Sequence, residues 1–361
     1  MATKPKRELL KRCARATAAV VLAGGGAAAV REDPGVSNGT VVVTGAAGFL
    51  GSHVVELLSG TGRFEVIATD VAGSARSAAL AVLPRVHFHA ADLRDTQTIE
   101  TLVRGADSIV HLAAVRNQAS AARPREAHDV NVGATFDLVS FAARHQLRRF
   151  VYASSHLVYG AFDDPQRDPF TEDQGAVRRG LTMYAASKLA SEALIGAVCG
   201  DSGPDYLALR FGTIYGPRVN LDSNNGLLVA VLTALDRGEN PQIPWTRDTI
   251  HALIYVADAA EAVARALDVE HARAAVNVVD SPVTAERLYA TLVALYGGDP
   301  HDIDWRDERA RYQLVSSERL RTVLGLQTQT SLEEGLSTLI DWYRTELRAV
   351  ESIGTDPGPQ R

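Results

Sequence analysis

A short β-branched run followed at once by closely spaced glycines limits the folds open to this chain. Residues 40–44 read Thr-Val-Val-Val-Thr, residues 45–51 read Gly-Ala-Ala-Gly-Phe-Leu-Gly, and helical periodicity follows. The first run predicts a buried parallel strand. The glycines permit a tight turn, a close approach of the backbone to a diphosphate, and contact between helix and strand. The sequence therefore predicts a strand–turn–helix unit whose helix N-terminus binds phosphate groups.

A carboxylate at the end of the next predicted strand indicates which nucleotide binds there. The strand covers residues 64–69, and Asp70 follows it. A carboxylate at this point accepts hydrogen bonds from the adenosine ribose hydroxyls and repels a 2′-phosphate, so it favours NAD over NADP. Residues 24–29 have a similar glycine spacing, but an alanine-rich run precedes them, and we assign no site there. The predicted cofactor-binding residues of this unit are Gly45, Gly48, Phe49, Leu50, Gly51 and Asp70.

Strands and helices keep alternating after this unit. Further strands are predicted at 86–90, 107–114, 149–155 and 206–210, with a long helix over 126–145. This rhythm predicts an α/β fold, a doubly wound parallel Rossmann-type sheet with a smaller, mixed α/β C-terminal substrate domain. The cofactor is expected across the carboxyl ends of the strands. Further cofactor contacts are expected at Asp92, Leu93, Leu112, Ala113, Ala114 and Asn131.

Tyr184 and Lys188 stand four residues apart in a predicted helix and so share one face. An ammonium group there would lower the pKa of the phenol and make the tyrosine a usable base. The spacing also occurs by chance on solvated helices. Ser155, at the end of the predicted strand 149–155, offers a hydroxyl that would share a proton with the substrate and Tyr184, although paired serines also serve in turns.

The chain divides into four predicted parts. Residues 1–38 form a flexible extension, 39–211 the NAD-binding domain, 212–345 mainly the substrate domain with some segments returning to the sheet, and 346–361 a tail. The extension is basic and then apolar like a secretory signal peptide, but glycines at 24–26 interrupt its apolar run. We therefore expect a cytoplasmic protein.

Composition excludes several classes of function. A net charge of −6 argues against nucleic acid as the main partner. No apolar run is long enough to span a bilayer, so no membrane partner is expected. Cys13 and Cys199 are the only cysteines, which leaves no disulfide framework and no recognisable zinc site. We expect no bound metal and a small-molecule substrate.

The ordered motifs resemble those of the extended short-chain dehydrogenase/reductase family, in its NAD-dependent nucleotide-sugar epimerase/dehydratase branch, and are similar to those of UDP-sugar 4-epimerases. The resemblance covers about residues 40–345. It rests on the glycine loop, Asp70, His111-Leu112-Ala113-Ala114, Ser154-Ser155, Tyr184-x-x-x-Lys188, Tyr215-Gly216-Pro217-Arg218 and Tyr255-Val256-Ala257-Asp258.

The resemblance implies roles for the candidate catalytic residues. Tyr184 would be the acid/base, Lys188 would hold the nicotinamide ribose and tune the tyrosine, and Ser155 would orient the substrate hydroxyl. Phe211 stands where the family has an aromatic residue near the nicotinamide. The family often forms homodimers through two helices of each subunit, here 126–145 and 182–198, although the same faces could instead pack inside one subunit.

Residues 156 and 157 separate the possible reactions. Similar 4,6-dehydratases have an Asp-Glu pair where this chain has His156-Leu157, and sugar-uronate decarboxylases have a glutamate at position 157. Without these acids, an NAD-dependent C4 epimerase of a nucleotide sugar is expected. An NAD-dependent sugar or alcohol dehydrogenase that releases NADH is the alternative. A non-catalytic NAD-sensing protein is a third, disfavoured by the complete set of Ser155, Tyr184 and Lys188.

The predicted substrate contacts depart from the family pattern. Members that bind nucleotide diphosphates carry an arginine where this chain has His251, and Thr213 replaces a frequent asparagine. Arg306 matches a second phosphate-contacting arginine. A substrate without a diphosphate, such as a monophosphate, therefore stays open. The predicted substrate-binding residues are Ser155, His156, Thr213, Arg218, His251 and Arg306.

Overall fold

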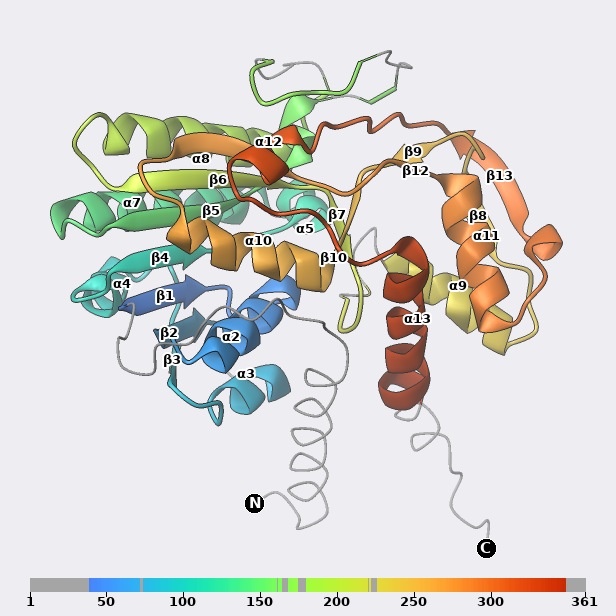
Figure 1. The fold of residues 1–361 in the computed structure, drawn as a ribbon, viewed down its shortest axis with the longest axis horizontal. Coiled ribbons are helices and arrows are strands. Elements are labelled where there is room, and N and C mark those ends of the chain that lie inside the picture. Colours follow the sequence, from blue (N-terminus) through green and yellow to red (C-terminus); the bar gives the residue numbers. More distant parts are fainter. Residues whose placement is uncertain are drawn as a thin grey trace, which may run out of the picture.

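A seven-stranded parallel sheet forms the core of the part of the molecule at the left of Figure 1. The computed structural model describes residues 39–71, 74–160, 162–163, 168–174, 180–219, 221 and 226–348. The strand order is β11-β6-β5-β4-β1-β2-β3, and all neighbours run parallel. The strands are β1 (Thr40–Thr44), β2 (Glu65–Asp70), β3 (Val86–Ala90), β4 (Ser108–His111), β5 (Arg149–Ser155), β6 (Asp205–Phe211) and β11 (Arg273–Val278).

The strand order reverses between β1 and β4. The chain proceeds from β1 outward through β2 to β3, then returns to β4 on the other side of β1 and proceeds through β5 and β6. A crevice forms at such a switch point, outside the carboxyl ends of the strands, and ligands bind there. Residues 45–51 and 112–115 follow β1 and β4 and therefore meet at this point. The predicted doubly wound Rossmann-type sheet is confirmed.

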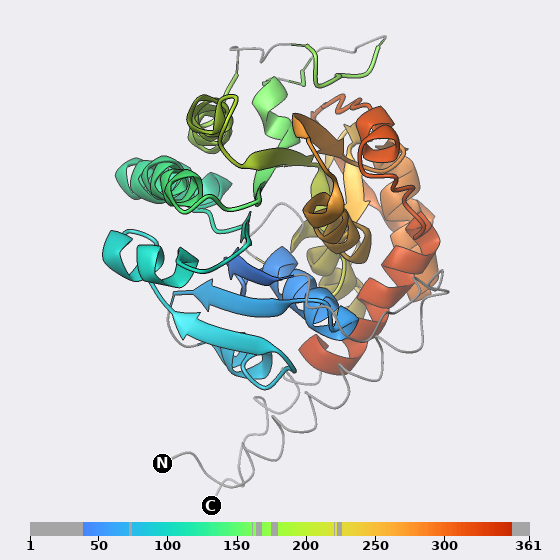
Figure 2. The ribbon, with the colours of Figure 1, turned by 60° about the vertical axis from the view of Figure 1, so that its left-hand side comes forward.

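Helices cover both faces of the sheet (Figure 2). Alternate strand residues point to opposite faces, so Val41 and Val43 pack in one core while Val42 packs in the other. The first core includes α2 (Phe49–Thr61) and α10 (Val256–Asp268), which contact each other. The second includes α4 (Thr96–Val103), α7 (Ala134–Arg144) and α8 (Met183–Cys199).

The predicted continuous helix over 126–145 is wrong in one respect. The structure has α6 (Pro124–His128), a π turn at Asp129–Gly133, and then α7. Inside the turn, the carbonyl of Asn131 accepts hydrogen bonds from the hydroxyls of Thr135 and Ser191, each at 2.7 Å. These side chains satisfy a carbonyl that a π turn removes from the regular helical pattern, and such turns are frequent at functional sites.

A second lobe has its own core of residues such as Leu232, Leu292 and Leu339. Within residues 212–345, β11 joins the main sheet and α10 packs against it. The sequence analysis allowed for such returning segments, and the division at residues 211/212 stays a prediction. The lobe contains α9 (Gly226–Asp236), α11 (Ala285–Tyr296), α13 (Leu332–Trp342) and the strand pairs β7 (Thr213–Tyr215) with β10 (Leu253–Tyr255), β8 (Gln242–Trp245) with β13 (Asp304–Arg309), and β9 (Ile250–His251) with β12 (Val283–Thr284).

Shorter helices complete the described chain: α3 (Ala75–Leu80), α5 (Asn117–Ala122), α12 (Glu318–Thr322), the 3-10 turns His156–Tyr159 and Pro300–Asp302, and a π turn at Tyr343–Leu347. The predicted extension 1–38, with its Gly-Gly-Gly-Ala-Ala-Ala run at 24–29, lies outside the described residues, as does most of the predicted tail. No helix in the described ranges combines the length and apolar character that crossing a membrane requires.

Candidate active site

The loop between β1 and α2 forms a cradle in which the glycines are required. Gly45 has a φ of +68°, and a Cβ on it would lie 2.6 Å from the backbone nitrogen of Ala113. The amide of Gly48 donates to the carbonyl of Gly45 at 3.0 Å. A Cβ on Gly51 would lie 2.0 Å from that same carbonyl oxygen. The backbone therefore turns tightly at the N-terminus of α2, where free N–H groups and the positive end of the helix dipole suit a diphosphate.

Asp70 lies beside this cradle at the end of β2. Its two carboxylate oxygens accept hydrogen bonds from the amides of Ala47 at 2.9 Å and Val71 at 2.8 Å. Burial raises the pKa of Asp70, and these amides counteract part of the rise. The carboxylate is thus fixed against the loop that would hold the diphosphate, as the adenosine ribose of NAD requires. The residues present fit an NAD molecule.

The other residues predicted to contact the cofactor differ in their burial and in their partners. Residues 112–114 are half-buried, and their backbone meets the glycine loop at Ala113. The carboxylate of Asp92 is held by Arg94, with a 2.5 Å ion pair. Leu93 and Phe211 are 8% and 4% exposed and belong to the hydrophobic cores. Contacts of Asp92, Leu93 and Phe211 with the cofactor stay predictions.

The structure brings Ser155, Tyr184 and Lys188 into one region, because β5 ends at Ser155 and α8 packs against β5. Thr182 caps α8 by accepting a hydrogen bond from the amide of Ala185 at 3.2 Å. The ammonium of Lys188 lies 5.6 Å from the centre of the Tyr184 ring. Ser155 accepts from the amide of Leu157 at 3.2 Å. Within the described residues no hydrogen bond joins the three side chains directly.

Burial controls the protonation of this pair. It raises the pKa of Tyr184 to about 12, with the Arg116 guanidinium acting to lower it. It lowers the pKa of Lys188 to about 7, against the opposing effect of Glu192. The expected lowering of the phenol's pKa by Lys188 is therefore not seen, because desolvation disfavours the charged form of both groups.

Asn131 connects three segments of the site. Its side-chain oxygen accepts from the amide of Val115 at 2.7 Å, and its side-chain nitrogen donates to the carbonyl of Val115 at 2.9 Å and to the hydroxyl of Ser187 at 3.0 Å. Ser187 in turn donates to the carbonyl of Tyr184 at 2.8 Å. Asn131 therefore fixes the Tyr184 helix relative to the end of β4. Direct contact between Asn131 and the cofactor stays a prediction.

A buried polar network that the sequence analysis missed begins behind the catalytic helix. Ser154 donates to Glu192, one turn beyond Lys188 on α8. Arg210 binds both oxygens of Glu192, at 3.1 and 2.8 Å, and donates to the hydroxyl of Tyr159 at 3.0 Å. The Arg210 and Glu192 side chains are only about one-tenth exposed. The network joins α8 to the strands on which Ser154 and Arg210 lie.

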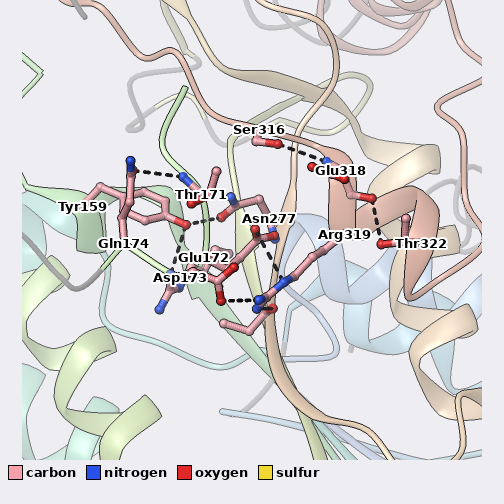
Figure 3. A network of polar contacts seen from close by, with 12 residues as sticks. Tyr159, Thr171, Glu172, Asp173, Gln174, Asn277, Ser316, Glu318, Arg319 and Thr322 are labelled. Atoms are coloured by element: carbon pink, nitrogen blue, oxygen red, sulfur yellow. Dashed lines mark hydrogen bonds and ion pairs between the residues drawn. The ribbon is translucent and has the colours of Figure 1, made fainter. Parts of the chain in front are cut away.

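The same network continues to the segment that precedes the catalytic helix (Figure 3). The Tyr159 hydroxyl donates to the side chain of Asn277 at 2.8 Å, and the amide of Asn277 donates to Glu172 at 2.7 Å. Arg319 on α12 forms ion pairs with Glu172 and with Asp173. Residues 168–174 are thus held between the sheet and α12. No short motif in the sequence indicates these partners, because they lie up to 146 positions apart.

The predicted substrate residues are more scattered. Arg218 binds Glu56 on α2 through two hydrogen bonds of 2.6 and 2.8 Å. Arg306 pairs with Asp304 at 2.8 Å, and Thr213 is half-buried on β7. Among the described residues, Arg218, Arg306 and Thr213 make no polar contact with one another, so their roles in substrate binding stay predictions.

Of the two candidate histidines, His156 is buried and His251 is half-buried. His156 contacts the carbonyl of Phe211 at 2.9 Å through Nδ1, and its Nε2 has no partner among the described residues. His251 packs edge-on against Trp245 and Tyr289, and its Nε2 likewise has no partner there. Burial lowers the pKa of each to about 4, with Arg311 adding to the effect. Both imidazoles are therefore neutral at neutral pH.

Comparison with known proteins agrees with this geometry. Residues 41–279 match the NAD dependent epimerase/dehydratase family. A putative UDP-glucose 4-epimerase of Methanocaldococcus jannaschii is 25% identical over 323 residues, covering 85% of this chain and 99% of that protein. A dTDP-glucose 4,6-dehydratase of Mycolicibacterium smegmatis is 28% identical over 316 residues, covering 84% and 93%.

Solved structures give the same result. MoeE5 in complex with UDP-glucuronic acid and NAD is 30% identical, with a TM-score of 0.72 over 85% of this chain and 99% of that one. A UDP-N-acetylglucosamine 4-epimerase from Methanobrevibacter ruminantium M1 is 25% identical, with a TM-score of 0.76 over 86% and 100%. The family match spans more than half of the chain and includes the glycine cradle, Tyr184 and Lys188. This chain belongs to the NAD-dependent epimerase/dehydratase family, with NAD as its cofactor.

Proposed function

We propose that this enzyme is an NAD-dependent epimerase that inverts C4 of a nucleotide-activated sugar. The observation that carries the proposal is that Tyr184 and Lys188 lie together on α8, which packs against the strand that ends at Ser155, while positions 156 and 157 hold a histidine and a leucine. Oxidation and reduction of a sugar alcohol need a proton acceptor and a hydride acceptor. Elimination of water needs a further acid and base, and this position does not supply them.

The side chains have distinct tasks in this reaction. Ser155 holds the C4 hydroxyl, and Tyr184 takes its proton as the C4 hydride leaves. Bound NAD⁺ would supply the hydride acceptor and donor for C4, and its positive charge would favour the Tyr184 phenolate. Lys188 holds the ribose hydroxyls and keeps positive charge near the phenolate. After the ketone turns over in the site, Tyr184 would return the proton to the C4 oxygen as the opposite face of C4 is reduced.

His156 is a poor candidate for an additional acid. Its Nδ1 contacts the Phe211 carbonyl, and its pKa is lowered to about 4. A neutral imidazole whose Nδ1–H is donated to that carbonyl has only an acceptor left at Nε2. It therefore has no proton to give to a leaving group at neutral pH, which favours epimerisation over dehydration.

The reaction outcome is tested by incubating the NAD-loaded enzyme with UDP-, dTDP- and GDP-linked hexoses and uronates and following C4 by NMR. Inversion without net NADH is the expected result. Stoichiometric absorbance at 340 nm would instead support the alternative, a dehydrogenase that releases NADH. Tyr184→Phe should abolish turnover, whereas Tyr206→Phe, at the opposite end of the sheet on β6, should retain it. Absence of inversion with every sugar would refute the proposal.

We also propose that the enzyme is a cytoplasmic homodimer that pairs α7 and α8 of each subunit. Phe136 on α7 is 44% exposed, which is unusual for a large apolar side chain on a sheet-covering helix. On α8, Ala186, Ala190 and Ala193 are exposed and follow helical spacing. Small residues at this spacing allow close helix packing.

A further inference from the structure

Arg116 is an arginine in the segment that follows the carboxyl end of β4. It follows β4 by five positions and is the N-cap residue of α5. The side chain is exposed, and none of the described residues forms a hydrogen bond or ion pair with its guanidinium. An arginine so placed, without an acidic neighbour to neutralise it, is available to an anionic ligand.

The backbone leading to Arg116 is rigid and is tied to the catalytic helix. Both the amide and the carbonyl of Val115 are bound by the side chain of Asn131, at 2.7 and 2.9 Å. The hydroxyl of Ser120 donates to the same carbonyl at 2.6 Å. Because Asn131 also holds Ser187, and Ser187 holds the carbonyl of Tyr184, the start of the Arg116 side chain has a defined position relative to Tyr184.

Arg116 is also electrostatically close to the catalytic phenol. It is the charged group that counteracts the effect of burial on the pKa of Tyr184. Lys188 is the other cation beside the phenol. The nearby carboxylate on α8, Glu192, is already bound by Arg210 and Ser154. The region around the phenol thus offers positive charge to a substrate.

The chemistry of a sugar nucleotide indicates which group would meet this charge. The hydroxyl that is oxidised must lie within about 2.6–3.2 Å of the Tyr184 oxygen. In a hexose oxidised at C4, C6 is attached to the neighbouring carbon C5, whereas the diphosphate is attached to C1 across the ring. A cation close to Tyr184 is therefore closer to the C6 substituent than to the diphosphate. A guanidinium matches a carboxylate through two parallel N–H···O bonds.

We propose that Arg116 is a specificity-determining residue that binds a carboxylate at C6, so that the substrate class is a nucleotide-activated uronate. The inference rests on the proposed function, because it assumes that a sugar is oxidised next to Tyr184. It adds a requirement that the proposed function does not make, namely a preference for an acidic sugar over the neutral sugar of the same nucleotide.

The test compares UDP-glucuronic acid with UDP-glucose on the NAD-loaded enzyme, by calorimetric binding and by kcat/KM. The wild type should prefer the uronate. Arg116→Gln should lower the preference by about 10- to 100-fold, the range expected for loss of a charge-assisted hydrogen-bonded pair. Arg116→Lys should recover part of it. Arg125→Gln, on α6 with an 85% exposed side chain, is the matched control and should leave the preference unchanged.

Several outcomes would overturn the assignment. They are a wild type that does not bind the uronate more tightly than UDP-glucose, an equal loss for both sugars in Arg116→Gln, or a loss of bound NAD in that variant. A wild type that inverts UDP-glucose but not the uronate would overturn this inference and leave the proposed epimerase in place. Selective binding of the uronate that depends on Arg116, without inversion of C4, would support this inference and overturn the proposed epimerase.

Discussion

Replacing Gly51 with alanine tests whether the loop between β1 and α2 holds the diphosphate of the cofactor. The new Cβ would lie 2.0 Å from the carbonyl oxygen of Gly45, 2.9 Å from its carbon and 3.0 Å from the Cα of Ala46. All three atoms are backbone, so no side chain can rotate away. Relief of the overlap requires a backbone shift on the order of 1 Å, which is large for a close-packed interior.

Such a shift would displace the amide groups that bind phosphate oxygens. The Gly45 carbonyl also accepts the Gly48 amide, so the turn moves as a unit. A hydrogen bond to a charged group contributes about 1.5–3 kcal/mol. Loss of one or two such bonds predicts that NAD affinity falls by roughly 10-fold to 10⁴-fold, at about 1.4 kcal/mol for each factor of ten.

Gly60→Ala is the matched control on the same helix. No atom lies within 4 Å of a Cβ built on Gly60. Its NAD affinity should equal that of the wild type, and its stability should rise by up to about 1 kcal/mol, because alanine favours the helix over glycine. Isothermal titration with NAD measures the affinities, and circular dichroism checks the fold. A folded Gly51→Ala enzyme that binds NAD within threefold of the wild type would refute the assignment of the cradle.

Three further predictions follow from contacts around the site. Arg210→Met removes the cation that pairs with the buried Glu192 carboxylate and should reduce the free energy of unfolding in urea by about 3–5 kcal/mol. As a control, Arg265→Ala removes an exposed ion pair with Glu261 and should reduce the free energy of unfolding by less than about 1 kcal/mol. Burial lowers the pKa of Lys188 from 10.5 to about 7, so the unfolded chain binds more protons than the folded chain between these pH values, and the melting temperature without cofactor should rise from pH 7 to pH 9. The melting temperature of Lys188→Met should rise less over the same range, and a pH dependence equal to that of the wild type would contradict the assignment. Ala190→Arg on the exposed face of α8 should convert a dimer to monomers in sedimentation velocity, and a monomeric wild type would exclude the proposed interface.

The NAD-binding half could be predicted because its signals are local. A β-branched strand, a glycine turn and a helix follow one another within residues 40–61, and Asp70 ends the next strand at β2. The strands at 40–44 and 149–155 begin and end as predicted. Alternation of strands and helices fixes the doubly wound arrangement, since parallel strands need crossover helices.

Asn131 shows where local patterns fail. The periodicity of 126–145 predicts an uninterrupted helix, but the structure has a π turn whose carbonyl and side chain are bound by residues of two distant segments. Those partners belong to the end of β4 and to α8, and nothing in the sequence near Asn131 identifies them. Arg210 and Glu192 are similar, because a buried ion pair between a strand and a helix leaves no spacing pattern.

The substrate lobe could not be predicted for a further physical reason. Its strands are only two to six residues long, so side-chain alternation does not determine their register. The motif around Arg218 suggested a ligand contact, yet its guanidinium is bound by Glu56 and joins the lobe to α2. His251 is neutral at neutral pH because burial lowers the pKa of the imidazole. It therefore cannot supply the positive charge of an arginine, and the proposed nucleotide-sugar substrate requires a cation from another residue for its diphosphate.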